Sequence, residues 1–186
     1  NEAHILFNSL ALYYIGSNVE RLFGHTRFAL IYFLGGLAGS IAMLFAGVGG
    51  LGASGAVFAI WGAEVAFFYK HRALFGAVAQ ARLRSSLIFM GMNFFLGFAA
   101  NAAADITNAE NAIRIGNSAH LGGLIGGGLL AWLIQPHFVA ERIANPQPGQ
   151  VPIQIVQTNK LIDRVRDILF YCVALAGLLL LAIWLS

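Results

Sequence analysis

The chain has 186 residues, of which 59% are hydrophobic and only 10% are charged, and its formal net charge is +3. A soluble domain is charged at about a quarter of its positions, so this composition indicates a membrane protein and excludes a separate soluble domain. The charges lie between apolar runs, which argues against nucleic acid as a partner. Cys172 is the only cysteine, so an intrachain disulfide and a cysteine metal cluster are both excluded.

The apolar runs predict an all-α protein, a polytopic bundle of transmembrane helices. A spanning helix needs about 20 mostly apolar residues. Six stretches reach or approach that length, namely 3–19, 28–47, 51–69, 86–104, 118–135 and 168–185. The third follows and contains several glycines, a density that favours irregular backbone before a helix starts. We therefore expect a loop there that dips into the membrane, covered by protein or water, and then becomes a helix.

The basic residues predict how these spans are oriented. Threading six spans alternately places every Lys and Arg in one set of connections, except Arg114. By the positive-inside rule the basic set is cytoplasmic, so the connections at 48–54 and 105–117 face outward, as does Asn1. An outward N-terminal end leads us to expect that a preceding span is missing.

The polar stretch 136–167 contains all four prolines and predicts a cytoplasmic linker with a short amphipathic helix near 155–167. The final run, within 168–186, is then an additional transmembrane helix attached to a core of residues 1–135. Three histidines belong to the cytoplasmic connections and are expected to be solvated: His25, His71 and His137.

The first candidate for chemistry is the serine of Gly52-Ala53-Ser54-Gly55. A serine that starts a helix after a tight turn exposes its hydroxyl beside unbonded backbone N–H groups and the positive end of the helix dipole. These are the parts of a nucleophile with an oxyanion site. On this pattern alone the better interpretation is structural, an N-cap serine between turn glycines.

The second candidate is His120, which shares a helix face with Gly123 and Gly127. A histidine inside a span is costly and points to function. Small residues on its face let another helix approach closely, and a base needs that approach to come within about 3 Å of a serine. The alternative is a histidine packed against a backbone carbonyl.

The third candidate is the pair His4 and Asn8, four residues apart on one face of the first run. Both can donate hydrogen bonds toward the same point, although an interfacial pair facing water is the simpler interpretation. The predicted orientation brings this pair, Ser54 and His120 to the outer ends of their spans. We therefore expect a nucleophile, a base and oxyanion donors in one cavity.

Other polar residues within the spans predict structure rather than chemistry. Glu64 lies in mid-span and needs a partner, while Asn93, Asn101 and Asn117 are expected to form hydrogen bonds between helices. The sequence has no H-E-x-x-H motif and no intramembrane aspartate pair. We therefore expect neither a metal nor a cofactor.

Together these segments resemble the rhomboid family of intramembrane serine proteases. The resemblance covers roughly 3–135 and rests on four motifs in order: His4-Ile5-Leu6-Phe7-Asn8, Asn18-Val19-Glu20-Arg21-Leu22-Phe23-Gly24, Gly52-Ala53-Ser54-Gly55 and Ala119-His120-x-x-Gly123-x-x-x-Gly127. It implies a six-helix core with a Ser/His dyad and no third acid. Ser54 would then be the nucleophile and His120 the general base, with an oxyanion hole made by His4, Asn8 and the Ser54 N–H.

The same resemblance gives roles to two further residues and marks what the chain lacks. Gly62 corresponds to a small helix-packing position, and Phe58 stands where many bacterial members have tyrosine. Phenylalanine can stack on the His120 imidazole but offers no hydroxyl. The chain would lack the family's first helix and the loop after it, and its last span would be the extra helix of a six-plus-one arrangement.

The implied function is a serine endopeptidase that cleaves transmembrane segments of membrane proteins. Its expected partners are such substrates and membrane lipid, and its expected location is the bacterial inner membrane. One alternative is a non-catalytic rhomboid-like protein that binds membrane clients, which need keep neither Ser54 nor His120. Another is a small transporter or channel, which would need a polar path that the mostly apolar cytoplasmic halves of the spans do not offer.

Overall fold

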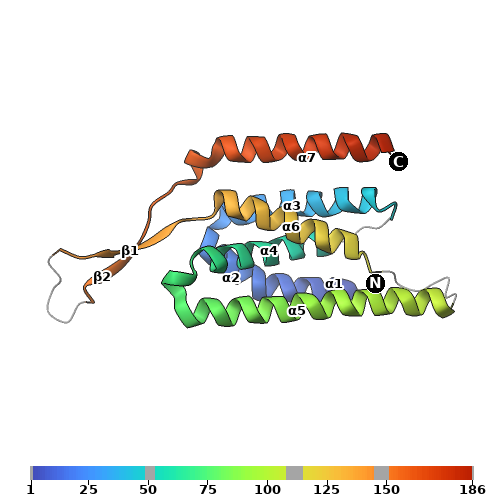
Figure 1. Ribbon diagram of the computed structural model, residues 1–186, viewed down its shortest axis with the longest axis horizontal. Coiled ribbons are helices and arrows are strands. Elements are labelled where there is room, and N and C mark those ends of the chain that lie inside the picture. Colours follow the sequence, from blue (N-terminus) through green and yellow to red (C-terminus); the bar gives the residue numbers. More distant parts are fainter. Residues whose placement is uncertain (1, 49–52, 108–114, 145–150, 186) are drawn as a thin grey trace.

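The computed structural model describes residues 2–48, 53–107, 115–144 and 151–185, and for residues 3 and 4 the backbone only. Long helices lie side by side along one axis, with α7 at one side and α5 at the other (Figure 1). The elements are α1 Glu2–Ala11, a π-helical turn Leu12–Gly16, α2 Ser17–Phe23, α3 His25–Phe45, α4 Ser54–Lys70, α5 Arg72–Thr107, α6 Asn117–Ile134 and α7 Val165–Leu185. The predicted all-α membrane bundle is confirmed.

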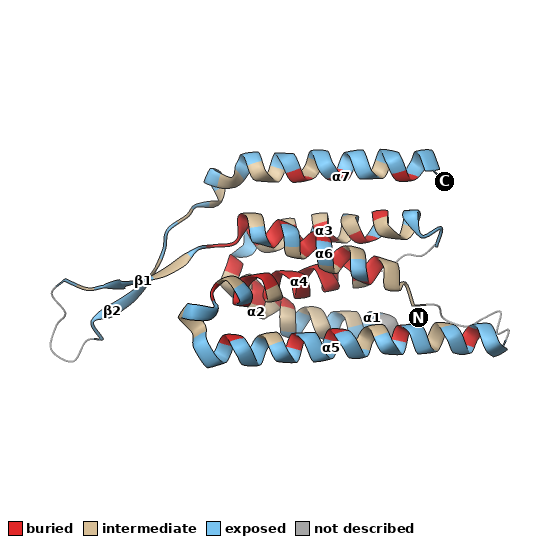
Figure 2. Ribbon diagram, in the orientation of Figure 1, coloured by how far each residue is buried: buried red, intermediate tan, exposed pale blue. Residues whose placement is uncertain are grey.

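Three helical stretches of the described chain are long and apolar enough to cross a membrane by length and composition: His25–Phe45, Arg72–Thr107 and Leu161–Leu185. The helices α4 and α6 are shorter or richer in glycine. They form the interior of the bundle, where buried residues concentrate, whereas α5 and α7 are exposed along most of their length (Figure 2). A helix that is covered by its neighbours needs small residues for close packing more than it needs a strongly apolar surface.

Glycines bring α3, α4 and α6 into backbone contact. A Cβ placed on Gly39 of α3 would lie 2.7 Å from the Ala119 carbonyl oxygen of α6 and 3.3 Å from Cα of Gly55 in α4. One turn earlier in α3, a Cβ on Gly35 would lie 3.2 Å from Cα of Gly127. Because lipid tails are as apolar as leucine, such packing of small residues is a main source of helix association in a membrane.

A β-hairpin takes up the beginning of the segment near 155–167 where we expected a short amphipathic helix. Strand β1 (Phe138–Arg142) pairs antiparallel with β2 (Ile153–Gln157), and the hairpin projects beyond the end of the bundle where α4 meets α5 (Figure 1). A 3₁₀ turn, Leu161–Arg164, then leads into α7. The helix prediction was wrong for residues 155–157, where β-branched residues favour a strand once a partner strand is available, whereas residues 161–167 are helical.

His71 is buried, with 4% of its surface exposed, so its predicted solvation was wrong, whereas His25 and His137 are exposed. Its Nδ1 lies 2.9 Å from the Phe67 carbonyl oxygen, and its Nε2 accepts the Phe138 N–H at 3.3 Å. This bonding pattern assigns the proton of a neutral imidazole to Nδ1. His71 thereby ties the end of α4 to the start of β1.

Lowering the pH is expected to loosen this tie. Burial lowers the pKa of His71 below its ordinary 6.5, the positive charges of His137 and Lys70 lower it further, and the Phe67 carbonyl partly opposes them. The unfolded chain therefore binds the proton more readily, so the stabilising contribution is present above about pH 6.5 and is lost as the pH falls below it. The temperature of thermal unfolding in detergent should fall more steeply with decreasing pH in the parent than in His71→Gln.

The exposed His25 provides the control for this comparison, since its side chain is 93% exposed. His25→Gln should follow the pH dependence of the parent. If His71→Gln also followed it, the buried imidazole would not be the group that responds.

The asparagines behave differently from one another. Asn101 of α5 donates to the Ile115 carbonyl at 2.9 Å and accepts the Ile115 N–H at 2.8 Å, which joins α5 to the segment before α6. Asn93 instead donates to Phe89 in its own helix at 2.9 Å, so it is not the interhelical bond we expected. The Asn117 amide packs against Gly97 of α5 and has no hydrogen-bond partner among the described residues.

Candidate active site

Ser54 is the first residue of α4 and is half-buried. The Ala53 carbonyl accepts the Val57 N–H at 3.0 Å, so Ala53 occupies the N-cap position. The structural alternative for Ser54, an N-cap serine, is therefore wrong. The N–H groups of the first helical turn have no acceptor within the helix, and the positive end of the helix dipole lies there. Ser54 thus stands where a negative charge would be stabilised.

His120 lies in the first turn of α6 and is only 7% exposed. The ring of Phe58, one turn after Ser54, stacks on its imidazole with centroids 4.2 Å apart and an interplanar angle of 8°. Phe58 therefore stacks on the His120 imidazole, as the sequence suggested it could. Because residues four apart share a helix face, the face of α4 that carries Ser54 is turned toward His120.

Phe94 of α5 completes the aromatic surroundings of the imidazole. Its ring meets His120 edge-on at a centroid distance of 6.4 Å and meets Phe58 at 5.5 Å. Phe94 could not be found from the sequence, because no local spacing connects a residue of α5 with the motifs on α4 and α6.

Backbone contacts fix the starts of α4 and α6 side by side. A Cβ on Gly123 would lie 2.8 Å from the Gly55 carbonyl carbon, and one on Gly55 would lie 3.3 Å from the Ala119 oxygen. Gly55, the residue after Ser54, therefore touches Ala119, which precedes His120, and Gly123, which lies about one turn after it. Farther along, a Cβ on Gly62 would lie 2.9 Å from the Gly128 nitrogen, and one on Gly127 would overlap Ala59, so the two helices stay close.

The predicted oxyanion donors are only partly within the described residues. Asn8 is half-buried on α1, and α1 packs against α4. The side chain of His4 and the whole of Gly52 lie outside the described residues. The oxyanion hole therefore stays a prediction.

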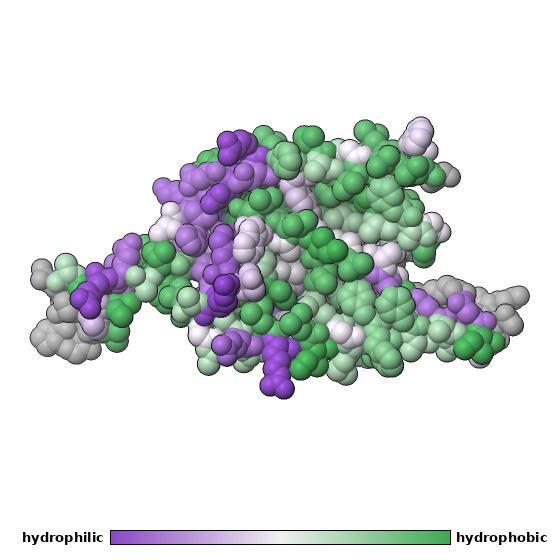
Figure 3. Space-filling model, viewed as in Figure 1, coloured by the Kyte–Doolittle hydropathy of each residue, from purple (hydrophilic) through white to green (hydrophobic). Residues whose placement is uncertain are grey.

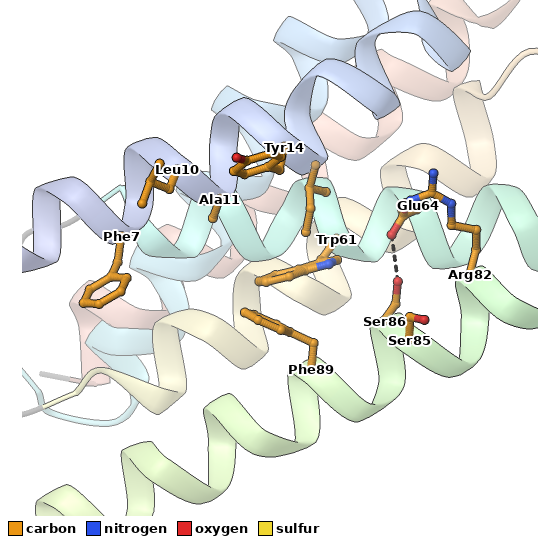
Figure 4. A pocket seen from close by; sticks show the side chains of 11 residues that line it. Phe7, Leu10, Ala11, Tyr14, Trp61, Glu64, Arg82, Ser85, Ser86 and Phe89 are labelled. Carbon is orange, nitrogen blue, oxygen red and sulfur yellow. Dashed lines mark hydrogen bonds and ion pairs between the residues drawn. The ribbon is translucent and has the colours of Figure 1, made fainter.

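A pocket of about 400 Å³ opens over α4, between α5 on one side and α1 with the π-helical turn on the other (Figure 4). Trp61 and Phe89, with ring centroids 4.4 Å apart, form its apolar wall, and Phe7 and Leu10 face them from α1. Trp61 lies seven residues after Ser54 and so shares its helix face, and this spacing would have identified it from the sequence.

The end of this pocket that is formed by Glu64 of α4 is polar. Ser86 donates to a carboxylate oxygen of Glu64 at 2.7 Å, and Arg82 lies 3.8 Å from the other oxygen. Glu64 and Ser86 are each only 4% exposed. The partner that Glu64 was expected to need therefore comes from α5.

Comparisons with known proteins relate the chain to one family. The family model of the Rhomboid domain matches residues 1–137. The chain is 32% identical over 170 residues to the Rhomboid protease GluP of Bacillus subtilis, which covers 91% of this chain and 29% of that protein. It is 34% identical over 139 residues to RHOMBOID-like protein 1 of Arabidopsis thaliana, covering 73% of this chain and 32% of that protein.

A third relative differs in its description. The Inactive RHOMBOID-like protein 8 of Arabidopsis thaliana is 28% identical over 199 residues, covering 97% of this chain and 50% of that protein. The chain thus spans between about a third and a half of the length of these three relatives. No solved structure matches the chain significantly.

Proposed function

The chain belongs to the rhomboid family, and from that premise we propose that this integral membrane protein is a serine endopeptidase that cleaves transmembrane segments with a Ser54/His120 dyad. The observation that carries the proposal is the contact between the first turns of α4 and α6. Gly55 packs against Ala119 and Gly123, and Phe58 stacks on His120.

The proposed reaction is acyl transfer to water. His120 takes the Ser54 proton as Oγ attacks a peptide carbonyl, and the Ser54 N–H with Asn8 and His4 stabilises the oxyanion. His120 then gives the proton to the leaving amine, and a water molecule, activated by the same imidazole, hydrolyses the acyl-enzyme. The proposed dyad has no acid to orient the imidazole. The Phe58 ring orients it instead, by stacking on its face.

The pocket between α1 and α5 suggests where a substrate segment would lie. Its wall of Trp61 and Phe89 suits apolar side chains, and it begins one turn beyond Phe58. A helix shields its own carbonyl groups, so the substrate must unwind at the cut. We therefore propose substrates whose transmembrane segment is weakened by helix-breaking residues and has a small residue at the cleavage site.

The proposed location is the bacterial inner membrane, with the end of the bundle that carries Lys70, Arg72 and the hairpin in the cytoplasm. A bacterial relative, the Rhomboid protease GluP, supports this proposal.

A non-catalytic protein that binds membrane clients is the second candidate, because one relative is described as inactive. Labelling with a fluorophosphonate separates the two candidates, since only an activated serine attacks this reagent. The full chain in mild detergent should be labelled at Ser54, and labelling should be lost in Ser54→Ala and strongly reduced in His120→Ala. Labelled peptides are located by mass spectrometry.

Ser40→Ala is the matched control for this experiment. Ser40 is an exposed serine of α3 whose hydroxyl bonds the Gly36 carbonyl of its own helix at 3.2 Å, so its loss should leave labelling unchanged. A parent protein that is labelled no faster than Ser54→Ala would favour the non-catalytic candidate.

A further inference from the structure

A second hollow lies on the opposite side of the bundle from the pocket beside α5. The helix α7 leaves a groove of about 480 Å³ against α3 and α6. Its lining is apolar almost throughout and runs from Trp132 and Phe170 at one end toward Phe45 and Leu178 at the other. Such a volume is typical of small-molecule sites, and an apolar lining inside a membrane suits a hydrocarbon chain.

Basic side chains gather at the end of the groove where α7 begins. Nζ of Lys70 lies 5.4 Å above the ring of Trp132, which itself lines the groove. Burial and then the positive charge of Arg164 lower the pKa of Lys70, so these two cations repel each other. Figure 3 shows hydrophilic residues over the start of α7 and mainly hydrophobic ones along the rest of it.

The groups that face Arg27, Lys70 and Arg164 do not balance the positive charges of these three side chains. Arg27 donates to the Ile134 carbonyl at 2.7 Å and is buried, so its charge is held by dipoles rather than by an acid. Asp167 lies 3.4 Å from Nη1 of Arg164, yet the Nε of that arginine is buried with no hydrogen-bond partner among the described residues. The cluster of Arg27, Lys70 and Arg164 therefore keeps a positive excess, which favours an anion beside it.

Tyr171 adds a polar group inside the groove. The residue is 7% exposed, and its hydroxyl has no hydrogen-bond partner within the part of the chain that the structure describes. It lies against Gly126, where a Cβ would stand 2.9 Å from the hydroxyl oxygen. Buried hydroxyls are nearly always hydrogen-bonded, so an acceptor on a molecule in the groove would satisfy this one.

We propose that this groove binds one anionic diacyl phospholipid. The phosphate lies at Lys70 and Arg164, one acyl chain follows the groove along α7, and the Tyr171 hydroxyl donates to an ester carbonyl. Tyr171 comes six residues after Val165, which places it about 9 Å along the helix from its first residue and hence below the headgroup. Basic pockets between helices at the cytoplasmic side of a membrane are suited to anionic headgroups. The proposal does not depend on catalysis by Ser54.

The test measures lipid binding to the full chain after delipidation, by native mass spectrometry with added phosphatidylglycerol or phosphatidylcholine of the same acyl chains. Phosphatidylglycerol should bind more tightly. A Lys70→Gln/Arg164→Gln variant should lose about fivefold per charge, or roughly 25-fold in all, for phosphatidylglycerol, and much less for phosphatidylcholine, whose choline cation already offsets its phosphate. Arg84→Gln, an exposed change on α5 across the bundle from α7 (Figure 1), should match the parent.

A second variant tests the groove itself. Ala174 lines the groove and is exposed on α7, so Ala174→Phe fills the groove without disturbing the core and should weaken both lipids alike. The proposal is overturned if the parent binds the two lipids equally, if Arg84→Gln weakens binding as much as the double variant, or if Ala174→Phe changes nothing. A second copy of the chain in place of lipid, seen as a doubled mass that Ala174→Phe abolishes, also overturns it.

Discussion

Replacing Ser54 by alanine should reduce cleavage of a single-span reporter substrate in proteoliposomes to the background rate, a loss on the order of 10³-fold or more in kcat/KM. The change removes the proposed attacking oxygen but only one atom from a half-buried position, so folding should be unaffected. Cleavage is measured by gel analysis of the reporter, and thermal unfolding of the variant reports its fold.

Substitution of His120, alone and together with Ser54, tests whether the two residues act together. Nucleophile and base act as one unit, so His120→Ala should cost nearly as much as Ser54→Ala, and the double variant little more than either. A Ser54→Ala protein that cut the reporter as fast as the parent would rule out the serine mechanism. Additive losses in the double variant would mean that the two residues act independently.

Replacing Gly123 by alanine should be the most disruptive single-methyl change near the site. The new Cβ would overlap the carbonyl oxygen of Gly55. Neither atom can rotate away, since the oxygen belongs to one helix backbone and the position of a Cβ is fixed by the other. We expect a loss of about 1–3 kcal/mol in the free energy of unfolding, the usual cost of overpacking. We also expect about a 10²-fold loss of kcat, because a displacement of about 1 Å between reacting groups has that effect.

Two glycines elsewhere provide matched controls for Gly123→Ala. On the same helix, a Cβ on Gly128 would meet its nearest atom, the Gly62 oxygen, at 3.4 Å, and on α5 a Cβ on Gly91 would meet nothing within 4 Å. Alanine at either position should leave unfolding and cleavage close to those of the parent. If Gly123→Ala unfolded and cleaved as Gly128→Ala does, the contact between α4 and α6 would not be as tight as the structure has it.

Local patterns were enough to predict the helices and to single out the candidate residues. Within the described residues each predicted span lies mainly on helix, the first of them across α1, the π-helical turn and α2, because hydrophobicity over about 20 residues is a property of the segment itself. Ser54 and His120 could be found for a similar reason, since a serine in a glycine-rich turn and a histidine in a span are unusual within their own segments.

Predictions that depended on partners from distant segments were less successful. The sequence could not show that His71 is covered by Phe138 or that residues 153–157 find a strand to pair with. Nor could it place Ala53, rather than Ser54, at the N-cap of α4, because that depends on which carbonyl accepts the first helical bond. The first two features are decided by contacts between distant segments, which no pattern within one segment contains.

A helical membrane protein with a serine and a histidine as candidates for chemistry follows from the amino-acid sequence, because burial in lipid dictates composition segment by segment. The three-dimensional packing was needed to see that the first turns of α4 and α6 touch, that Phe58 and Phe94 surround His120, and that Ser86 donates to Glu64. Glycines permit close approach, but the packing of α3, α4 and α6 together selects which glycines meet.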